Sequence, residues 1–268
     1  MLWEDRRLPV FHPNELCPSE EHLRMLIERA FGTPLEWAIK IGESTFGILY
    51  AVGLPGESAP VTVKWQKYRG RGALEKRQLE ELGRYACVRV PGVLYYHPGS
   101  EEIPLEALVL DYIPGVPANQ AEPTDDEQAE TLARSVVQVL LCWHSVSNPL
   151  GYGRLDGPYY DRWIDYYSQR VEAYYGHIHA LESALPAVVM EAAGQSYEHA
   201  EEIIGEIRGD AVLIHSDFWL ANVIVDPETL GVMGVIDPLD AEWADRELDL
   251  VVLDWPWGDP DYLRDLYL

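Results

Sequence analysis

The chain has 268 residues, of which 47% are hydrophobic and 11% aromatic, so it is long enough and apolar enough to fold around a sizeable core. Its 45 acidic and 20 basic residues give a formal net charge of −25, which excludes nucleic acid and anionic membranes as expected partners. No apolar run approaches the ~20 residues that a membrane-spanning helix needs.

A glycine-containing loop lies between two strand-like runs near the start of the chain. After a helix expected over residues 20–30 and capped by Ser19, the segment Ile39–Val52 contains the loop Gly42–Gly47. Such a loop places backbone N–H groups and the hydroxyl of Ser44 or Thr45 where they can close over phosphates. Any hairpin turn can contain two glycines, so this interpretation depends on the residues that follow.

Strand and helix patterns then alternate up to a Pro-Gly turn. Pro60–Trp65 alternates like a strand, with Lys64 on the face opposite Val63. Ala73–Ala86 has the spacing of a helix, and Ala107–Gly115 reads as a buried strand that runs into a turn. We therefore expect residues 1–113 to form an N-terminal nucleotide-binding lobe and residues 114–268 a C-terminal catalytic and substrate lobe.

The second half of the chain has mainly helical patterns. A capping box at Thr124 is expected to open a helix that reaches Ser145. Further helices are expected over Tyr159–Tyr175, Leu185–Ile207 and Arg246–Asp254. The aromatic stripe of the second helix is interpreted as core, with stacking on a cationic substrate as the alternative.

The most informative motif is His215-Ser-Asp217-Phe-Trp-Leu-Ala-Asn222, followed by Asp237. Asn222 directly precedes the apolar run Val223–Val225, and Asp237 directly follows the run Val232–Ile236. The turn formers between the two runs predict an antiparallel hairpin. In such a hairpin the residue that enters the first strand lies beside the residue that leaves the second, within about 5 Å. Asn222 and Asp237 should therefore converge, with Asp217 on the loop that leads into the same hairpin.

Oxygen ligands from one amide and one carboxylate suit Mg²⁺, which takes few protein ligands and leaves the rest to phosphates and water. A further carboxylate held off the metal can orient a hydroxyl and accept its proton during phosphoryl transfer. If each residue stood in isolation, the simpler interpretation would be that Asp217 and Asn222 form hydrogen bonds within a loop and that Asp237 caps the end of a strand. The ordered set favours a metal-phosphate site, with His215 bracing the loop backbone.

The segment from Val212 to Leu253 resembles the catalytic region of the aminoglycoside phosphotransferase and fructosamine kinase superfamily, which also includes choline kinases. Asp237-Pro238 followed by Ala244–Leu250 is most similar to the fructosamine kinase branch. The family's fold is similar to that of protein kinases. The resemblance therefore implies an α+β, bilobal, protein-kinase-like fold with a small mixed β-sheet N-lobe and a larger, mainly helical C-lobe that carries a catalytic β-hairpin.

The resemblance also implies a role for each residue that matches the family's motifs. Asp217 is expected to be the catalytic base, and Asn222 and Asp237 the Mg²⁺ ligands. Lys64 is expected to hold the nucleotide phosphates, paired with Glu75 on the following helix. One departure from the family pattern is Ser216, where glycine is more common.

Further expectations concern the nucleotide base and the support of the site. The resemblance implies that the backbone of Asp111 and Ile113 contacts adenine, although an ordinary strand end explains this stretch nearly as well. Asp249 is expected to support the catalytic loop. The three acids after the metal ligand are interpreted as loop residues, with contact to a cationic acceptor as the alternative: Asp240, Glu242 and Asp245.

The leading functional hypothesis is a kinase that uses ATP and Mg²⁺ to phosphorylate a hydroxyl of a small substrate. The acidic chain favours an amine-bearing substrate such as a fructosamine or an aminoglycoside, although acidic residues also serve solubility. The alternative is a catalytically silent, kinase-like nucleotide-binding or scaffolding protein. A protein kinase fits less well because Asp237-Pro238 is not Asp-Phe-Gly and a short segment follows it.

The expected compartment is the cytoplasm. Cys17, Cys87 and Cys142 are widely spaced and odd in number, which argues against disulfides and a zinc site. The opening segment Met1–Asp5 lacks the basic start and apolar core of a signal peptide. The sequence does not indicate an oligomeric state.

Overall fold

A five-stranded antiparallel sheet forms the first lobe of the computed structural model, which describes residues 17–180, 185–207 and 209–268. The opening segment Met1–Asp5 lies outside these residues. The strand order is β1-β2-β3-β5-β4. The elements are α1 (Glu20–Phe31), β1 (Trp37–Glu43), β2 (Gly47–Gly53), β3 (Val61–Gln66), α2 (Arg71–Tyr85), β4 (Val93–His97) and β5 (Ala107–Asp111).

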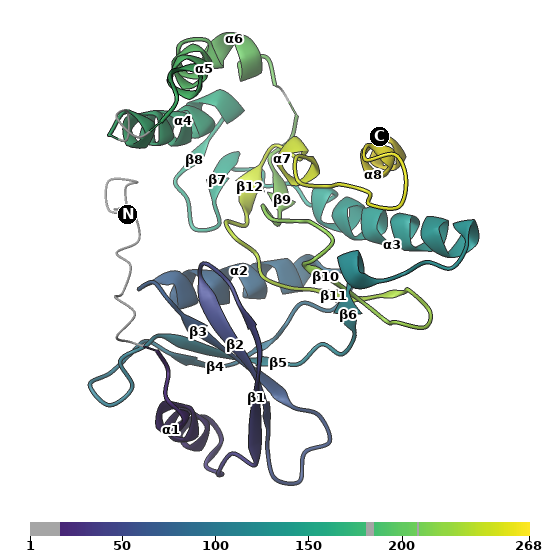
Figure 1. Cartoon of the computed structure of the whole chain (residues 1–268). Coiled ribbons are helices and arrows are strands. Elements are labelled where there is room, and N and C mark those ends of the chain that lie inside the picture. The colour runs from purple at the N-terminus through teal and green to yellow at the C-terminus, as the bar shows by residue number, and fades with distance from the viewer. Residues whose placement is uncertain (1–16, 181–184, 208) are drawn as a thin grey trace.

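Helices α1 and α2 cover opposite faces of this sheet, as Figure 1 shows. The faces follow from the two-residue period of the strands. Val63 and Val109 pack with Leu26 of α1 in one buried cluster. Leu108 and Leu110, which flank Val109 on β5 and so point to the opposite face, pack with Leu79 of α2 in another cluster. Since Lys64 lies between Val63 and Trp65 on β3, its side chain points to the α2 face.

The second lobe is mainly helical and contains two small sheets (Figure 1). The sheets have the orders β11-β10-β6 and β8-β7-β12-β9. The elements are β6 (Val116–Pro117), a 3₁₀ turn (Ala118–Gln120), α3 (Asp126–His144), β7 (Tyr152–Arg154), β8 (Tyr159–Tyr160), α4 (Trp163–Ala180), α5 (Ala187–Glu198), α6 (Ala200–Ile204), β9 (Val212–Ile214), β10 (Val223–Val225), β11 (Val232–Val235), β12 (Glu242–Ala244), α7 (Glu247–Leu250) and α8 (Tyr262–Tyr267).

The predicted helices differ from the structure mainly at their ends, and α2 begins at Arg71 rather than Ala73. The side chain that caps α3 belongs to Asp125 rather than Thr124, because its carboxylate accepts from the Gln128 N–H at 2.9 Å. Helix α4 begins at Trp163, since Tyr159 and Tyr160 pair with β7 as a strand. The helix expected over residues 185–207 is divided at His199 into α5 and α6. The helix expected over residues 246–254 is reduced to the single turn of α7.

The two lobes meet along α2. Leu82 of this helix is fully buried in the larger hydrophobic cluster, which otherwise consists of second-lobe side chains and the segment after α2. Its carbonyl oxygen accepts a hydrogen bond from the Trp143 indole N–H at 3.1 Å. Helix α2 is therefore anchored in both lobes. Across the described parts of the chain, none of the helices combines the length and apolar character needed to cross a membrane.

Candidate active site

The β10–β11 hairpin brings the two predicted metal ligands to one end of the second lobe's small sheet. Val223 pairs with Val235, and the Ile236 N–H donates to the Asn222 carbonyl oxygen at 2.9 Å. Asn222 therefore enters the hairpin beside the point where Asp237 leaves it. The convergence expected from the two apolar runs is present, even though fifteen positions separate the residues.

Asp217 joins this pair through its hydrogen bonds to Asn222. The Asn222 side-chain amide donates to the Asp217 carboxylate at 3.0 Å and to the Asp217 carbonyl oxygen at 2.9 Å. This orientation leaves the amide oxygen of Asn222 free of those two contacts and able to face a cation. Burial raises the pKa of the Asp217 carboxyl, while the hydrogen bond from Asn222 opposes that shift.

The loop that carries Asp217 is held in place from below by Asp249. This fully buried carboxylate accepts from the Ser216 N–H at 2.6 Å and from the His215 N–H at 2.9 Å. Ser216 has φ of 68°, in the left-handed region where a side chain is strained. Glycine suits that conformation, so Asp249 supports a loop geometry that the serine alone disfavours. His215 braces the same loop, with Nε2 3.2 Å from the Ile236 carbonyl oxygen.

Lys64 connects the first lobe to this site. Its ammonium contacts the Glu75 carboxylate at 2.7 Å and also forms an ion pair with Asp237. Burial opposes the charged amine, but Glu75 and Asp237 outweigh that effect and raise the pKa of Lys64. The ion pair expected between β3 and α2 is thus present. Contact with Asp237 adds a link between the lobes that was not predicted.

In the glycine-containing loop between β1 and β2, the Ser44 side chain already occupies two of the backbone N–H groups. The Ser44 hydroxyl oxygen accepts from the backbone N–H groups of Phe46 at 3.2 Å and Gly47 at 3.1 Å. These two amides therefore face Ser44, and the expected cradle of backbone N–H groups is incomplete in this conformation. Thr45 lies at the exposed tip of the turn.

Asp111 and Ile113 lie where β5 leaves the first lobe. The Asp111 carboxylate accepts from the Gly92 N–H at 2.6 Å and pairs with Arg89 at 3.1 Å, so its side chain fixes the neighbouring loop. Ile113 is buried, and its side chain lies against Gly234 of β11. The side chains of both residues thus connect the end of β5 to neighbouring segments. The backbone contact of these residues with adenine remains a prediction.

The three acids after Asp237 differ in their surroundings. Glu242 is buried, pairs with Arg170 at 2.9 Å and accepts a hydrogen bond from Tyr166. Asp245 is nearly buried as well, and its carboxylate accepts from the Glu247 N–H at 2.9 Å. Asp240 is half-buried, with a carboxylate oxygen 4.0 Å from the Arg71 guanidinium. Only Asp240 of the three retains appreciable exposure, so Glu242 and Asp245 belong to the framework.

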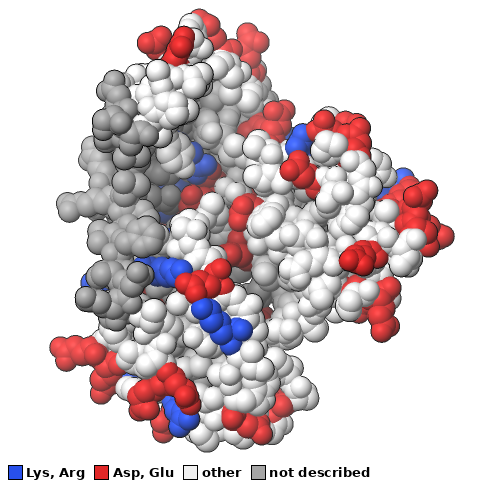
Figure 2. Space-filling model, viewed as in Figure 1, with Lys and Arg blue, Asp and Glu red and all other residues white. Residues whose placement is uncertain are grey.

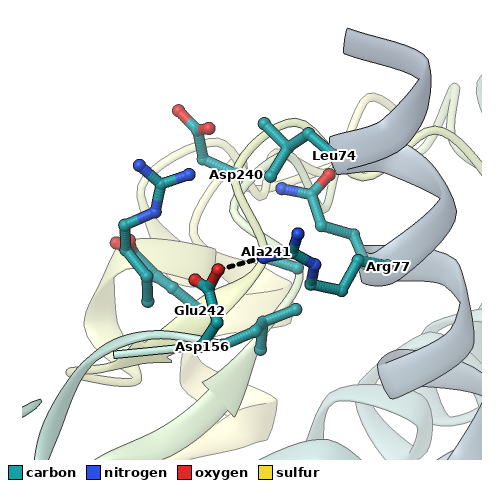
Figure 3. Close-up of a pocket in the computed structure, with 9 residues that line it drawn as sticks. Leu74, Arg77, Asp156, Asp240, Ala241 and Glu242 are labelled. Atoms are coloured by element: carbon teal, nitrogen blue, oxygen red, sulfur yellow. Dashed lines mark hydrogen bonds and ion pairs between the residues drawn. The ribbon is translucent and has the colours of Figure 1, made fainter. Parts of the chain in front are cut away.

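A small cavity separates α2 from the segment that contains these acids. Figure 3 shows Leu74 and Arg77 of α2 facing Asp156 and the residues 240–242. The cavity has a volume of about 10 Å³, the space of a single water. It is too small for a substrate and marks close packing between α2 and the loop after Asp237.

Two polar residues around Lys64 and Asp237 were not predicted from the sequence. Gln66 donates to the second carboxylate oxygen of Glu75 at 2.8 Å. Its position two residues after Lys64 on the same strand face was a usable signal. Arg71 donates to the Leu239 carbonyl oxygen at 3.1 Å. No local pattern identifies that contact, because 168 positions separate its partners.

Comparison with known proteins identifies the family. The model of the phosphotransferase enzyme family matches residues 68–266. An uncharacterized Escherichia coli protein, YcbJ, is 24% identical over 237 residues, which are 86% of this chain and 78% of YcbJ.

Solved structures of similar proteins share the fold. A candidate fructosamine-3-kinase from Thermobifida fusca aligns with a TM-score of 0.67 and 21% identity, covering 91% of this chain and 82% of that one. The streptomycin–ATP–APH(2")-IIa ternary complex aligns with a TM-score of 0.66 and 15% identity, covering 94% and 82%. These likenesses confirm the predicted bilobal, kinase-like fold. The chain belongs to the phosphotransferase enzyme family and is an enzyme of the small-molecule kinase type.

Proposed function

We propose that this enzyme transfers the γ-phosphoryl group of ATP, with Mg²⁺, to a hydroxyl of a small amine-bearing substrate such as a fructosamine or an aminoglycoside. The observation that supports this most directly is the buried Lys64, which contacts Glu75 and Asp237 at once. Through Asp237 the lysine lies beside the Asn222–Asp217 pair. A phosphate-binding cation, two oxygen ligands and a further carboxylate therefore share one site.

The nucleotide is proposed to bind between the lobes, with its phosphates on Lys64. Glu75 holds the ammonium, and Gln66 holds the Glu75 carboxylate, so the lysine is already in position when the nucleotide arrives. The Ser44 hydroxyl and Thr45 lie at the turn that precedes β2 and are proposed to cover the phosphates. ATP is bound in the streptomycin–ATP–APH(2")-IIa complex, which has the same fold, and this supports ATP as the donor.

The residues present fit a magnesium ion. Asn222 uses its amide nitrogen on Asp217, so its oxygen remains as a neutral ligand, and Asp237 offers a carboxylate. A hard cation that takes one or two protein oxygens needs no larger set. When bound, Mg²⁺ neutralises phosphate charge and orients the phosphates. Asp237 and Asn222 would hold it, and Lys64 would contribute its positive charge to the phosphates.

Asp217 is proposed to orient the acceptor hydroxyl and to take its proton. Burial raises the pKa of Asp217 and thereby makes the carboxylate a stronger proton acceptor than an exposed aspartate. The bond from Asn222 fixes one carboxylate oxygen at 3.0 Å, which leaves the other for the hydroxyl. Because the transition state is loose, placement and charge account for most of the expected rate enhancement.

The test is a panel of amines, amino sugars and glycated amines, with ATP consumption measured in the presence and absence of Mg²⁺. We expect at least one acceptor to raise ATP consumption, and Asp217→Asn to reduce that rate by about 10³-fold or more while nucleotide binding is retained. Asp210→Asn, which changes an exposed carboxylate of the same lobe, should match the wild type. Full turnover by Asp217→Asn would refute the assignment of the base.

The alternative, a silent nucleotide-binding protein, makes a different prediction for the same panel. It predicts ATP binding without stimulated consumption by any acceptor. A silent protein is expected to have lost at least one residue of the set that consists of Lys64, Asp217, Asn222 and Asp237. All four are present, which favours the kinase.

A further inference from the structure

Helix α2 begins without a capping side chain of its own. Its N-cap residue is Gly70, in the left-handed conformation with φ of 80°, and no side chain of the helix start accepts from the first amides. Glu106, the residue just before β5, supplies the missing acceptor from a distant part of the sequence. Its carboxylate accepts from the Ala73 N–H at 3.0 Å, although 33 positions separate the two residues. This carboxylate therefore performs the role of a cap at the positive end of the helix dipole.

The surroundings of Glu106 fix its carboxylate in this position. The Tyr96 hydroxyl donates to the same carboxylate oxygen at 2.6 Å, and the Glu106 side chain is buried. Burial, together with the nearby Glu106, raises the pKa of Tyr96, so the hydroxyl keeps its proton at neutral pH. The Gln66 N–H donates to the Glu106 carbonyl oxygen at 2.8 Å, which connects Glu106 to the strand that carries Lys64.

Gly72 provides the space for this contact. A Cβ atom at Gly72 would lie 2.9 Å from Cγ of Glu106 and 3.0 Å from its carboxylate. Any larger residue would displace the carboxylate from the helix N-terminus. The contact between Glu106 and the start of α2 therefore requires a glycine at position 72.

One face of α2 reaches two parts of the active site. Arg71, Glu75 and Gln78 are spaced by four and three residues and so share that face. Glu75 holds Lys64, while Arg71 donates to the Leu239 carbonyl oxygen at 3.1 Å. With its amide oriented to satisfy both partners, Gln78 donates to the Pro238 carbonyl oxygen at 3.3 Å and accepts from the Ala241 N–H at 3.1 Å. The loop that follows Asp237 is therefore attached to the same helix as the lysine's partner.

We propose that Glu106 is a positioning residue that holds the N-terminus of α2 and, through α2, sets both the Lys64–Glu75 pair and the loop after Asp237. The inference rests on the proposed function, because it assigns Lys64 to the phosphates and Asp237 to the metal. Glu106 contacts neither of them. It acts by keeping the binding-competent position of α2 populated before the nucleotide arrives.

The experiment measures ADP binding to the full-length chain by calorimetry, with Mg²⁺ and with EDTA. Glu106→Ala should weaken MgADP binding by at least about threefold, since it removes the cap and lowers the population of the competent helix position. The loss should be larger with Mg²⁺ than with EDTA, because the loop that presents Asp237 is affected too. Glu106→Gln keeps an acceptor oxygen for Ala73 and Tyr96 and should stay within about twofold of the wild type.

Two further variants make the result specific. Glu101→Ala removes an exposed carboxylate from the same loop and should bind MgADP like the wild type. Tyr96→Phe removes one of the two donors to Glu106, should fall between the wild type and Glu106→Ala, and serves if the alanine variant does not fold. A purely structural role would lower the folded fraction, and thus the binding stoichiometry, without changing the dissociation constant.

The outcomes separate this inference from the function on which it rests. Equal dissociation constants for the wild type and the Glu106→Ala and Tyr96→Phe variants would overturn the inference alone. Lack of MgADP binding by the wild type would overturn the proposed function, and the inference with it. Weaker MgADP binding by Glu106→Ala, together with near-wild-type binding by Glu106→Gln, supports both the inference and the proposed function.

Discussion

Lys64 is almost fully buried and lies between the buried carboxylate of Glu75 and the more exposed carboxylate of Asp237, which makes the residue important for folding as well as for the proposed chemistry. Its side chain and that of Glu75 are both buried. Breaking a buried ion pair by removing one partner leaves the other charge uncompensated, which costs about 3–5 kcal/mol. The cost comes from desolvation of the remaining charge rather than from the lost attraction alone.

At the residue scale we therefore predict a stability effect that a second substitution reverses. Lys64→Met should lower the free energy of unfolding by about 3 kcal/mol, because the buried Glu75 carboxylate then loses its cation and keeps the neutral Gln66 amide. Lys64→Met combined with Glu75→Met should recover most of that loss, although neither variant should transfer phosphate. Urea denaturation followed by circular dichroism measures the effect.

Lys67→Met is the matched control for this cycle. Lys67 pairs with Glu43, whose side chain is 45% exposed, so its removal should change the free energy of unfolding by less than about 0.5 kcal/mol. A Lys64→Met variant as stable as Lys67→Met would show that the buried pair has no such energetic role.

At the element scale, local patterns predicted the convergence of Asn222 and Asp237 better than they predicted the ends of helices. The β10–β11 hairpin follows from two apolar runs and the turn formers between them, so Asn222 and Asp237 could be brought together from the sequence. Alternation in β3 likewise placed Lys64 on the face of α2. These features depend on residues a few positions apart, which is what a sequence pattern records.

Features that depend on distant partners were not predictable in the same way. Tyr159 and Tyr160 were assigned to a helix, but aromatic residues also suit strands, and pairing with Tyr152 and Gly153 decided the outcome. The Glu106 cap on α2 joins residues 33 positions apart. Propensity and spacing contain no information about such contacts.

The connection between the lobes leads to a second prediction. Gly115 precedes β6 and has φ of 133°, and a Cβ atom there would lie 2.4 Å from the Val225 carbonyl oxygen of β10. Gly115→Ala should lower the free energy of unfolding by about 2 kcal/mol or more, because the backbone conformation and the contact are both unfavourable for alanine. Thermal unfolding measures the change.

Gly231→Ala provides the comparison for Gly115→Ala within the same small sheet region. A Cβ atom at Gly231 would meet only the Thr229 hydroxyl oxygen, at 3.5 Å, which is an ordinary contact. Its effect on the free energy of unfolding should stay within about 0.5 kcal/mol. Similar melting temperatures for the two variants would contradict the steric argument at Gly115.

At the scale of the whole molecule, acidic residues outnumber basic ones on both lobes. Figure 2 shows Asp and Glu side chains distributed over the visible face of each lobe. Many basic side chains are themselves paired with acids, such as Arg134 with Glu130 and Arg264 with Asp254. The proposed preference for a cationic substrate therefore rests on the net charge of −25 rather than on Glu242 or Asp245.

The lobes share α2, and this gives the last prediction. Leu82 is buried in the larger core, Trp143 of α3 donates to its carbonyl oxygen at 3.1 Å, and Arg77 pairs with Asp156 of the second lobe. Residues 114–268 alone would lack these partners and expose part of their core. We expect that fragment not to fold, and the full chain to unfold in one cooperative transition whose calorimetric and van't Hoff enthalpies agree.

Calorimetry of the full chain with and without MgADP is the decisive measurement, because a ligand held by both lobes should raise the whole transition together. Trp143→Phe keeps a benzene ring but removes the pyrrole ring with its N–H from a fully buried site, so it should lower the free energy of unfolding by about 2 kcal/mol without splitting the transition. Two separate transitions, or a native near-ultraviolet spectrum for residues 114–268, would show that the lobes are independent. In that case α2 could not transmit the state of one lobe to the other, since a helix can couple two units only if both lose packing when it moves.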